Sequence, residues 1–111
     1  MNSAIANKIL DLARKLGALQ YGEFVLSSGA KSNYYFDGRL ISLHPEGSYL
    51  LGKLFLAAIQ GTSISSVGGP AVAAIPIVSA VTLTSQIAKN PVAAFFVRAT
   101  AKDHGTERQI E

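Results

Sequence analysis

Apolar residues recur at helical spacing in two segments of the first half of the chain. In residues 3–17, four apolar side chains follow one another at intervals of four, three and four, which places them on one face of a helix: Ile5, Ile9, Leu12 and Leu16. A second helix is predicted from Pro45 to Gly61, because proline suits the first helical turn and glycine the end. His44, directly before it, is predicted to be a helix-start residue without a chemical role.

Between these helices the pattern changes to that of a hairpin. Residues 23–26 and 33–37 are rich in aromatic and β-branched side chains and flank a turn of serine, glycine, alanine and lysine at 27–31. The sequence therefore predicts two short paired strands. Within the second strand, Tyr34, Tyr35 and Phe36 alternate in direction, so one ring could stack on a planar ligand while its neighbours pack inward. Packing of these rings in the core is the alternative.

The second half of the chain has the pattern of one βαβ unit. A short strand at 64–67 is predicted to end in the turn Gly68-Gly69-Pro70, and a helix is predicted from about Pro76. That helix is apolar on nearly every side, so we expect it to be buried. Residues 92–97 are continuously apolar, which is typical of a strand covered on both faces. The fold class is therefore α/β with a parallel sheet, followed by a polar surface loop at 98–111.

Composition narrows the class of protein. The chain has 111 residues, 49% hydrophobic and 15% charged, which suits one globular domain. It contains no cysteine, which excludes disulfides and thiolate metal sites, and its two histidines predict no metal site. Neither a signal segment nor an apolar run of the ~20 residues needed to cross a bilayer is recognisable, so we expect a cytoplasmic protein without membrane contact. The net charge of +3 mildly favours phosphate-bearing partners.

The last residues carry the most chemistry. A guanidinium, an ammonium and an imidazole fall within seven residues after the last apolar strand: Arg98, Lys102 and His104. Open α/β sheets bind ligands at the carboxyl ends of their strands, and such a cluster fits a pyrophosphate. Gly105 would let the loop fold down without a side-chain clash. The alternative is a solvated charged loop, because acidic residues interleave with the basic ones.

Gly69 belongs to a second candidate phosphate site. A glycine-rich turn between a strand and a helix presents backbone amides to an anion. The segment Gly68-Gly69-Pro70 matches neither the dinucleotide fingerprint nor the P-loop, so a plain tight turn is the alternative.

Taken in order, these motifs resemble those of the orotate phosphoribosyltransferase family of bacterial type. The resemblance extends over essentially the whole chain and covers the N-terminal half of family members. The matching residues are Gly22-Glu23-Phe24, Ser28-Gly29, Lys31-Ser32, Tyr34, Phe36-Asp37, Arg39, Gly68-Gly69-Pro70, Phe96-Val97-Arg98, Ala101-Lys102, His104-Gly105-Thr106 and Ile110-Glu111.

The resemblance implies a partial type I phosphoribosyltransferase fold, with a parallel sheet flanked by helices. Residues 1–43 would form the N-terminal helix and a hairpin hood, 44–97 the first βαβ elements of the core, and 98–111 a mobile catalytic loop. The family transfers ribose 5-phosphate from phosphoribosyl pyrophosphate to orotate, with Mg²⁺ bound to the phosphoribosyl pyrophosphate. In family homodimers this loop reaches into the neighbouring subunit's site.

The same resemblance assigns roles to individual residues. Lys102 and His104 would be catalytic and would contact the pyrophosphate together with Arg98. Gly69 would bind the same substrate, and Tyr35 and Phe36 would lie beside orotate. Ala99 and Ser27 depart from the family, which usually has lysines at these positions.

Two other interpretations remain open at this point. A truncated or degenerate relative would bind pyrophosphate or a nucleotide without turnover. A small basic nucleic-acid-binding module is disfavoured, because residues 98–111 contain three arginine or lysine residues and three acidic ones, which leaves no sustained basic stripe.

Overall fold

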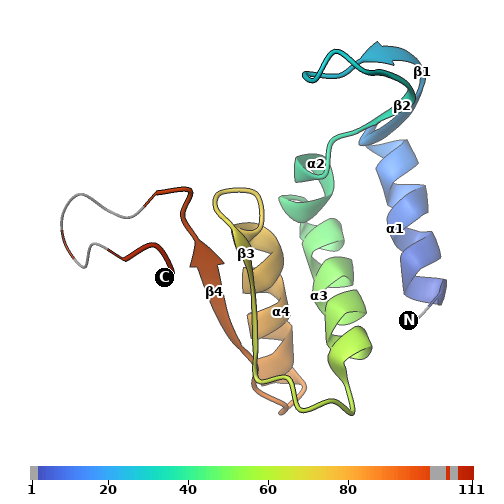
Figure 1. Ribbon diagram of the computed structural model, residues 1–111. Helices are drawn as coiled ribbons and strands as arrows, with labels where there is room; N and C mark the ends of the chain where they lie inside the picture. The colour runs from blue at the N-terminus through green and yellow to red at the C-terminus, as the bar shows by residue number, and fades with distance from the viewer. Residues whose placement is uncertain (1–2, 101–104, 106–107) are drawn as a thin grey trace.

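The computed structural model describes residues 3–100, 105 and 108–111. In this part of the chain α1, α3 and α4 pack side by side, a two-stranded hairpin rises at one end, and a parallel pair of strands lies on α4 (Figure 1). The elements follow in the order α1 (Ser3–Lys15), β1 (Leu19–Val25), β2 (Lys31–Phe36), α2 (Arg39–Ser42), α3 (Pro45–Ile59), β3 (Ser66–Pro70), α4 (Ile75–Ile87) and β4 (Ala93–Val97). None of the described helices is long and apolar enough to cross a membrane.

The predicted first helix is confirmed. α1 ends at Lys15, and Gly17 follows in the left-handed region with φ 75°, where glycine avoids a steric penalty. α1 packs on α3, and on α2 and β1 to a lesser extent. The core there consists of Leu12, Ala13, Ala18, Ile41 and Leu50, with Ile5, Ile9 and Leu16 half-buried against it. The four periodic residues therefore do face the core, although Leu16 lies just after the end of α1.

The hairpin is confirmed, although its first strand begins earlier than predicted. β1 and β2 are antiparallel, with Leu19 opposite Phe36 and Val25 opposite Lys31. The register shifts between Tyr21 and Phe24, where Gly22 has φ 154°. This irregularity interrupts the alternation of side chains, which is why the sequence pattern revealed only the second half of β1.

The predicted second helix is confirmed as α3, and His44 caps it. The Nδ1 atom of His44 accepts hydrogen bonds from the amides of Glu46 at 3.1 Å and Gly47 at 3.4 Å. The short helix α2 was not predicted, because four residues are too few to show a periodicity.

The parallel βαβ unit is confirmed, but its first strand begins and ends later than predicted. β3 continues through Gly68, Gly69 and Pro70, which pair with Phe95, Phe96 and Val97 of β4. The prediction that these glycines form the turn is therefore wrong. A Cβ atom on Gly68 would overlap the ring of Phe95, so glycine lets this ring pack closely on β3.

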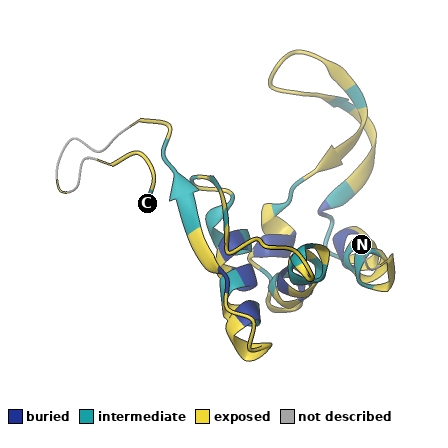
Figure 2. Cartoon of the chain, turned by 60° about the horizontal axis from the view of Figure 1, so that its bottom comes forward, coloured by how far each residue is buried: buried dark blue, intermediate teal, exposed yellow. Residues whose placement is uncertain are grey.

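Burial in this unit is lower than predicted. In α4, Val78 and Val81 are buried, whereas Leu83 is 64% and Ile87 is 74% exposed. No residue of β4 is buried, although Val92 just before it is (Figure 2). The predictions of an all-round buried helix and of a strand covered on both faces are therefore wrong, because the described elements cover only one side of each.

The described residues of the predicted surface loop at 98–111 are mostly exposed and form no helix or strand, but the pairing of its end with β4 was not predicted. Residues 109–111 return along β4 in antiparallel orientation, with a bridge between Val97 and Ile110. The amides of Phe96 and Glu111 each donate to the other residue's carbonyl, at 2.9 and 2.8 Å. Residues 101–104 and 106–107 lie outside the described residues.

Candidate functional site

The candidate site lies at the carboxyl ends of β3 and β4. Pro70 is paired with Val97, and the amide of Ala71 donates to the Val97 carbonyl at 2.9 Å. The turn at 71–74 and Arg98 therefore lie at the same edge of the sheet, and the turn leads directly into α4. This edge is the usual ligand position in parallel α/β sheets.

Gly69 lies just before this turn, within the strand. A Cβ atom at position 69 would come 2.6 Å from the Cβ of Ala74, so glycine allows the turn to fold closely against β3. The amide of Ala74 donates to the Pro70 carbonyl at 3.1 Å, and the peptide bond between Ala71 and Val72 is cis. The role of Gly69 in binding a substrate stays a prediction.

Arg98 follows directly on β4 and has a defined environment. Its Nη2 atom lies 3.6 Å from Oε2 of Glu111, and its guanidinium carbon lies 5.4 Å from the centroid of the Phe96 ring. Its Nε atom is buried without a hydrogen-bond partner among the described residues. The side chain remains 35% exposed, so an anion could still reach it.

Lys102 and His104, the two predicted catalytic residues, lie outside the described residues. Gly105 is described and has φ 71°, a conformation that favours glycine. The prediction that Gly105 lets the loop fold down stays a prediction.

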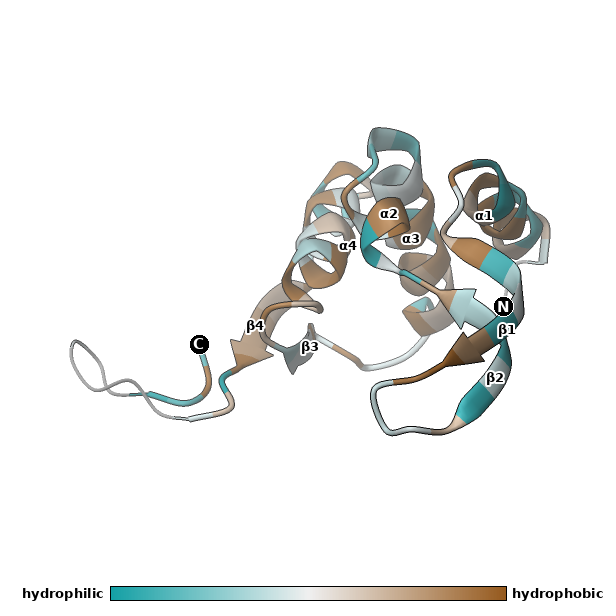
Figure 3. Cartoon of the chain, turned by 90° about the horizontal axis from the view of Figure 1, so that it is seen from above, coloured by the Kyte–Doolittle hydropathy of each residue, from teal (hydrophilic) through white to brown (hydrophobic). Residues whose placement is uncertain are grey.

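The aromatic residues of the hairpin are exposed rather than buried. Tyr34 is 53%, Tyr35 43% and Phe36 51% exposed, so the alternative of core packing is not what the structure shows. The ring of Tyr35 lies 5.8 Å from that of Phe24. Seen from above, the hairpin and the β3–β4 pair lie apart, on opposite sides of α2 (Figure 3). The structure therefore joins Gly69 and Arg98 at one edge and places Tyr35 and Phe36 on a separate element.

Sequence reasoning gave no role to the ion pair between Asp37 and Arg39, at the start of α2. Nε and Nη2 of Arg39 donate to the two carboxylate oxygens of Asp37 at 3.0 and 2.9 Å. The hydrogen bonds from Arg39 hold the pKa of Asp37 below its ordinary value, and Asp37 raises the pKa of Arg39. The signal in the sequence was the spacing of an acid two residues before a base.

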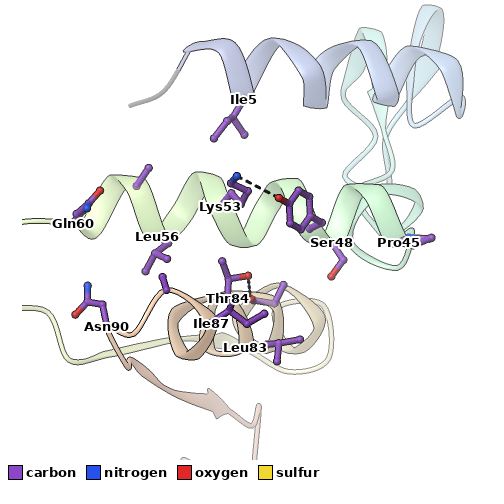
Figure 4. A pocket seen from close by; sticks show the side chains of 14 residues that line it. Ile5, Pro45, Ser48, Lys53, Leu56, Gln60, Leu83, Thr84, Ile87 and Asn90 are labelled. Atoms are coloured by element: carbon purple, nitrogen blue, oxygen red, sulfur yellow. Dashed lines mark hydrogen bonds between the residues drawn. The ribbon is translucent and has the colours of Figure 1, made fainter.

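A groove of about 630 Å³ lies elsewhere, between α3 and α4, with Ile5 of α1 on one side (Figure 4). Leu56, Leu83 and Ile87 make its walls largely apolar. Its one described cation is Lys53, which donates to the Tyr49 hydroxyl at 3.3 Å and lies 5.2 Å from the centre of that ring. Among the described residues, no group of three or more His, Cys, Asp or Glu side chains is placed to hold a metal ion, in this groove or at the sheet edge.

No family model matches the chain. Curated proteins do: the chain is 39% identical over 109 residues to orotate phosphoribosyltransferase of Nostoc sp., covering 98% of this chain and 52% of that protein. It is 42% identical over 94 residues to that of Synechocystis sp., covering 85% of this chain and 47% of the relative. The chain thus spans about half the length of the curated relatives it matches.

Solved structures give the same result. The crystal structure of Mycobacterium tuberculosis orotate phosphoribosyltransferase in complex with Fe(III) dicitrate matches with a TM-score of 0.76 and 34% identity, covering 96% of this chain and 59% of that one. The same enzyme in complex with 5-phospho-α-D-ribosyl 1-diphosphate matches with a TM-score of 0.69 and 26% identity, covering 100% of this chain and 52% of that one. In sequence and in fold, the chain therefore corresponds to the N-terminal half of the orotate phosphoribosyltransferases.

Proposed function

We propose that this chain forms the orotate- and pyrophosphate-binding part of an orotate phosphoribosyltransferase. The reaction transfers ribose 5-phosphate from phosphoribosyl pyrophosphate to N1 of orotate and gives orotidine 5'-monophosphate and pyrophosphate, a step of pyrimidine synthesis. The observation that carries the proposal is the meeting of Arg98 and the turn at 71–74 at one sheet edge. The family of the similar proteins supports the same reaction.

The chemistry explains why cations should gather at this edge. As the bond between ribose and pyrophosphate breaks, positive charge develops on the ribose ring and negative charge on the leaving group. A guanidinium matches two phosphate oxygens at once, and fixed positive groups stabilise the charge that develops in the transition state. We propose that Arg98, Lys102 and His104 serve this leaving group, with Gly69 keeping the adjacent turn close to it. A covalent nucleophile is not needed.

The hairpin supplies the second half of the proposed site. Tyr35 and Phe36 present exposed rings on one strand, and exposed rings offer a face on which a planar base stacks. We propose that orotate lies beside these two residues.

The proposal includes Mg²⁺ as a partner of the substrate. The described residues offer no cluster of metal ligands, so Mg²⁺ would arrive bound to phosphoribosyl pyrophosphate, and we assign it no step through this chain.

We also propose a homodimer, because Leu83 and Ile87 leave an apolar face exposed on α4. The cytoplasm is the proposed location, because the chain has no cysteine and orotate chemistry is metabolic.

Calorimetric titration with inorganic pyrophosphate in the presence of Mg²⁺ tests the site. We expect Arg98→Ala and Lys102→Ala each to weaken binding by about tenfold or more, because a charge-assisted hydrogen bond contributes roughly 1.5 to 3 kcal/mol. Arg14→Ala, which removes an exposed guanidinium from α1, is the matched control and should bind like the parent. Parental affinity in both site variants would show that the anion binds elsewhere.

A further inference from the structure

We propose that Glu111 is a positioning residue for Arg98: its carboxylate attracts the guanidinium and keeps it at the edge of the sheet, where an anion can bind. The choice of pyrophosphate as the anion rests on the proposed function. The observation behind it is that the end of the described chain returns to β4 and places a carboxylate beside the arginine.

Backbone hydrogen bonds with β4 determine where Glu111 lies. Its amide and carbonyl are both paired with Phe96, at 2.8 and 2.9 Å, so residue 111 sits opposite a residue of β4. Its side chain is only 18% exposed, and its Oε2 atom lies 3.6 Å from Nη2 of Arg98. Because the backbone of Glu111 is paired with β4, the position of its carboxylate is restricted. The carboxylate therefore attracts the guanidinium of Arg98 towards one place.

Arg98 itself is held from two more sides. Its amide donates to the carbonyl of Gln109 at 2.7 Å, and its carbonyl accepts a hydrogen bond from Nε2 of Gln109 at 2.9 Å. The guanidinium also lies over the ring of Phe96. The backbone, the ring and the carboxylate therefore restrict the guanidinium together, and a restricted side chain loses less freedom when it binds a ligand.

The arrangement leaves donors for an anion. A guanidinium has five N–H groups in a rigid fork, and the ion pair with Glu111 involves Nη2. The Nε atom is buried and has no hydrogen-bond partner among the described residues. The side chain as a whole is still 35% exposed, so part of the guanidinium fork remains accessible to an anion.

Charge alone predicts the opposite effect of Glu111. A carboxylate close to an anion site repels the anion, so removal of Glu111 would strengthen binding if only charge mattered. If Glu111 positions Arg98, its removal weakens binding even though a negative charge is lost. Glu111→Ala therefore separates the two explanations by the sign of its effect. Glu111→Gln keeps an oxygen acceptor of similar shape without the charge.

The test combines calorimetry with NMR of the full 111-residue chain. With Mg²⁺ and inorganic pyrophosphate, we expect Glu111→Ala to bind about tenfold more weakly than the parent, a change of roughly 1.4 kcal/mol, and Glu111→Gln to stay within about threefold. Asp11→Ala, which removes a carboxylate from α1, controls for the change in net charge and should match the parent.

The NMR readout needs no ligand. The Nε–H signal of Arg98, identified by its loss in Arg98→Lys, should exchange slowly with water in the parent and in Glu111→Gln, and faster in Glu111→Ala. Equal or tighter pyrophosphate binding by Glu111→Ala would overturn the proposal. If the parent binds no pyrophosphate, the proposed function fails at this site. The NMR result then decides alone, and an unchanged exchange rate in Glu111→Ala would overturn the positioning role.

Discussion

Single glycines set the distance between the helices of this protein. A Cβ atom on Gly52 in α3 would overlap the hydroxyl of Thr84 and come 2.8 Å from the carbonyl oxygen of Ala80, both in α4. A Cβ on Gly47 would overlap the carbonyl of Ile41 in α2. Both residues are buried, and neither has an unusual φ. These glycines are therefore required by close packing rather than by backbone conformation.

We predict that Gly52→Ala destabilises the fold. Alanine favours a helix over glycine by about 1 kcal/mol, but overpacking typically costs about 1 to 3 kcal/mol, and the Ala80 carbonyl cannot rotate away. A lower midpoint of urea unfolding than that of the parent is the expected result. Gly38→Ala is the matched control, because its Cβ would lie 3.4 Å from a Phe36 ring atom, an ordinary contact. A midpoint for Gly52→Ala at or above the parent's would contradict the prediction.

At the scale of elements, one serine joins α4 to β4. Ser85 is 1% exposed. Its hydroxyl donates to the Thr82 carbonyl at 2.7 Å, and its oxygen accepts from the amide of Val92 at 2.9 Å. The Thr82 hydroxyl donates to the carbonyl of Val92, so both polar groups of the residue that precedes β4 are bound to α4. The helix thereby determines where the strand begins.

We predict that Ser85→Ala lowers the free energy of unfolding by about 1 to 3 kcal/mol, because the buried amide of Val92 loses its acceptor. Urea unfolding measures the difference. Ser63→Ala, at an exposed position in the segment before β3, should change it by less than about 0.5 kcal/mol. Equal effects of the two substitutions would show that another group replaces Ser85 as the acceptor.

At the scale of the whole molecule, the chain is less compact than a typical domain. Its radius of gyration is 16.0 Å, whereas a compact domain of this length has roughly 13 Å. The hairpin projects from the helices, and β4 is covered on one side only (Figure 2). The chain spans about half the length of the curated relatives that it matches.

We predict that the 111-residue chain alone does not convert orotate. Orienting the reacting atoms contributes roughly 7 to 11 kcal/mol to such a reaction, and contacts to pyrophosphate alone leave the ribose unoriented. Stabilisation of the leaving pyrophosphate by cations does not replace this orientation of the ribose towards orotate. The assay follows orotate absorbance with phosphoribosyl pyrophosphate and Mg²⁺.

The control for this assay adds the separately expressed carboxyl-terminal half of a complete relative. Activity only in the mixture would support the proposed function. No activity in either would favour a relative that binds pyrophosphate without turnover. Robust turnover by the chain alone would contradict the prediction.

The sequence by itself determined the local elements and their order. Helical periodicity predicted α1 and α3, and turn residues between aromatic and β-branched runs predicted the hairpin. An apolar strand on each side of a helix predicted the parallel pair. The same order of motifs resembles that of the orotate phosphoribosyltransferases, and proteins of that name are similar to the chain in sequence and in fold. Each of these signals is short-range, because it depends on neighbouring residues and on backbone geometry that a few residues specify.

Only the tertiary structure decided burial and partners. An apolar run does not reveal which faces other elements cover, so the exposure of Leu83 and Ile87 was not predicted. Gly68 and Gly69 suggested a turn, but both lie in β3, where the ring of Phe95 and the Cβ of Ala74 pack closely on them. The pairing of Arg98 with Glu111 joins residues thirteen positions apart through a returning segment. These outcomes depend on contacts between residues that are far apart in the chain. The spacing of neighbouring residues does not specify such contacts.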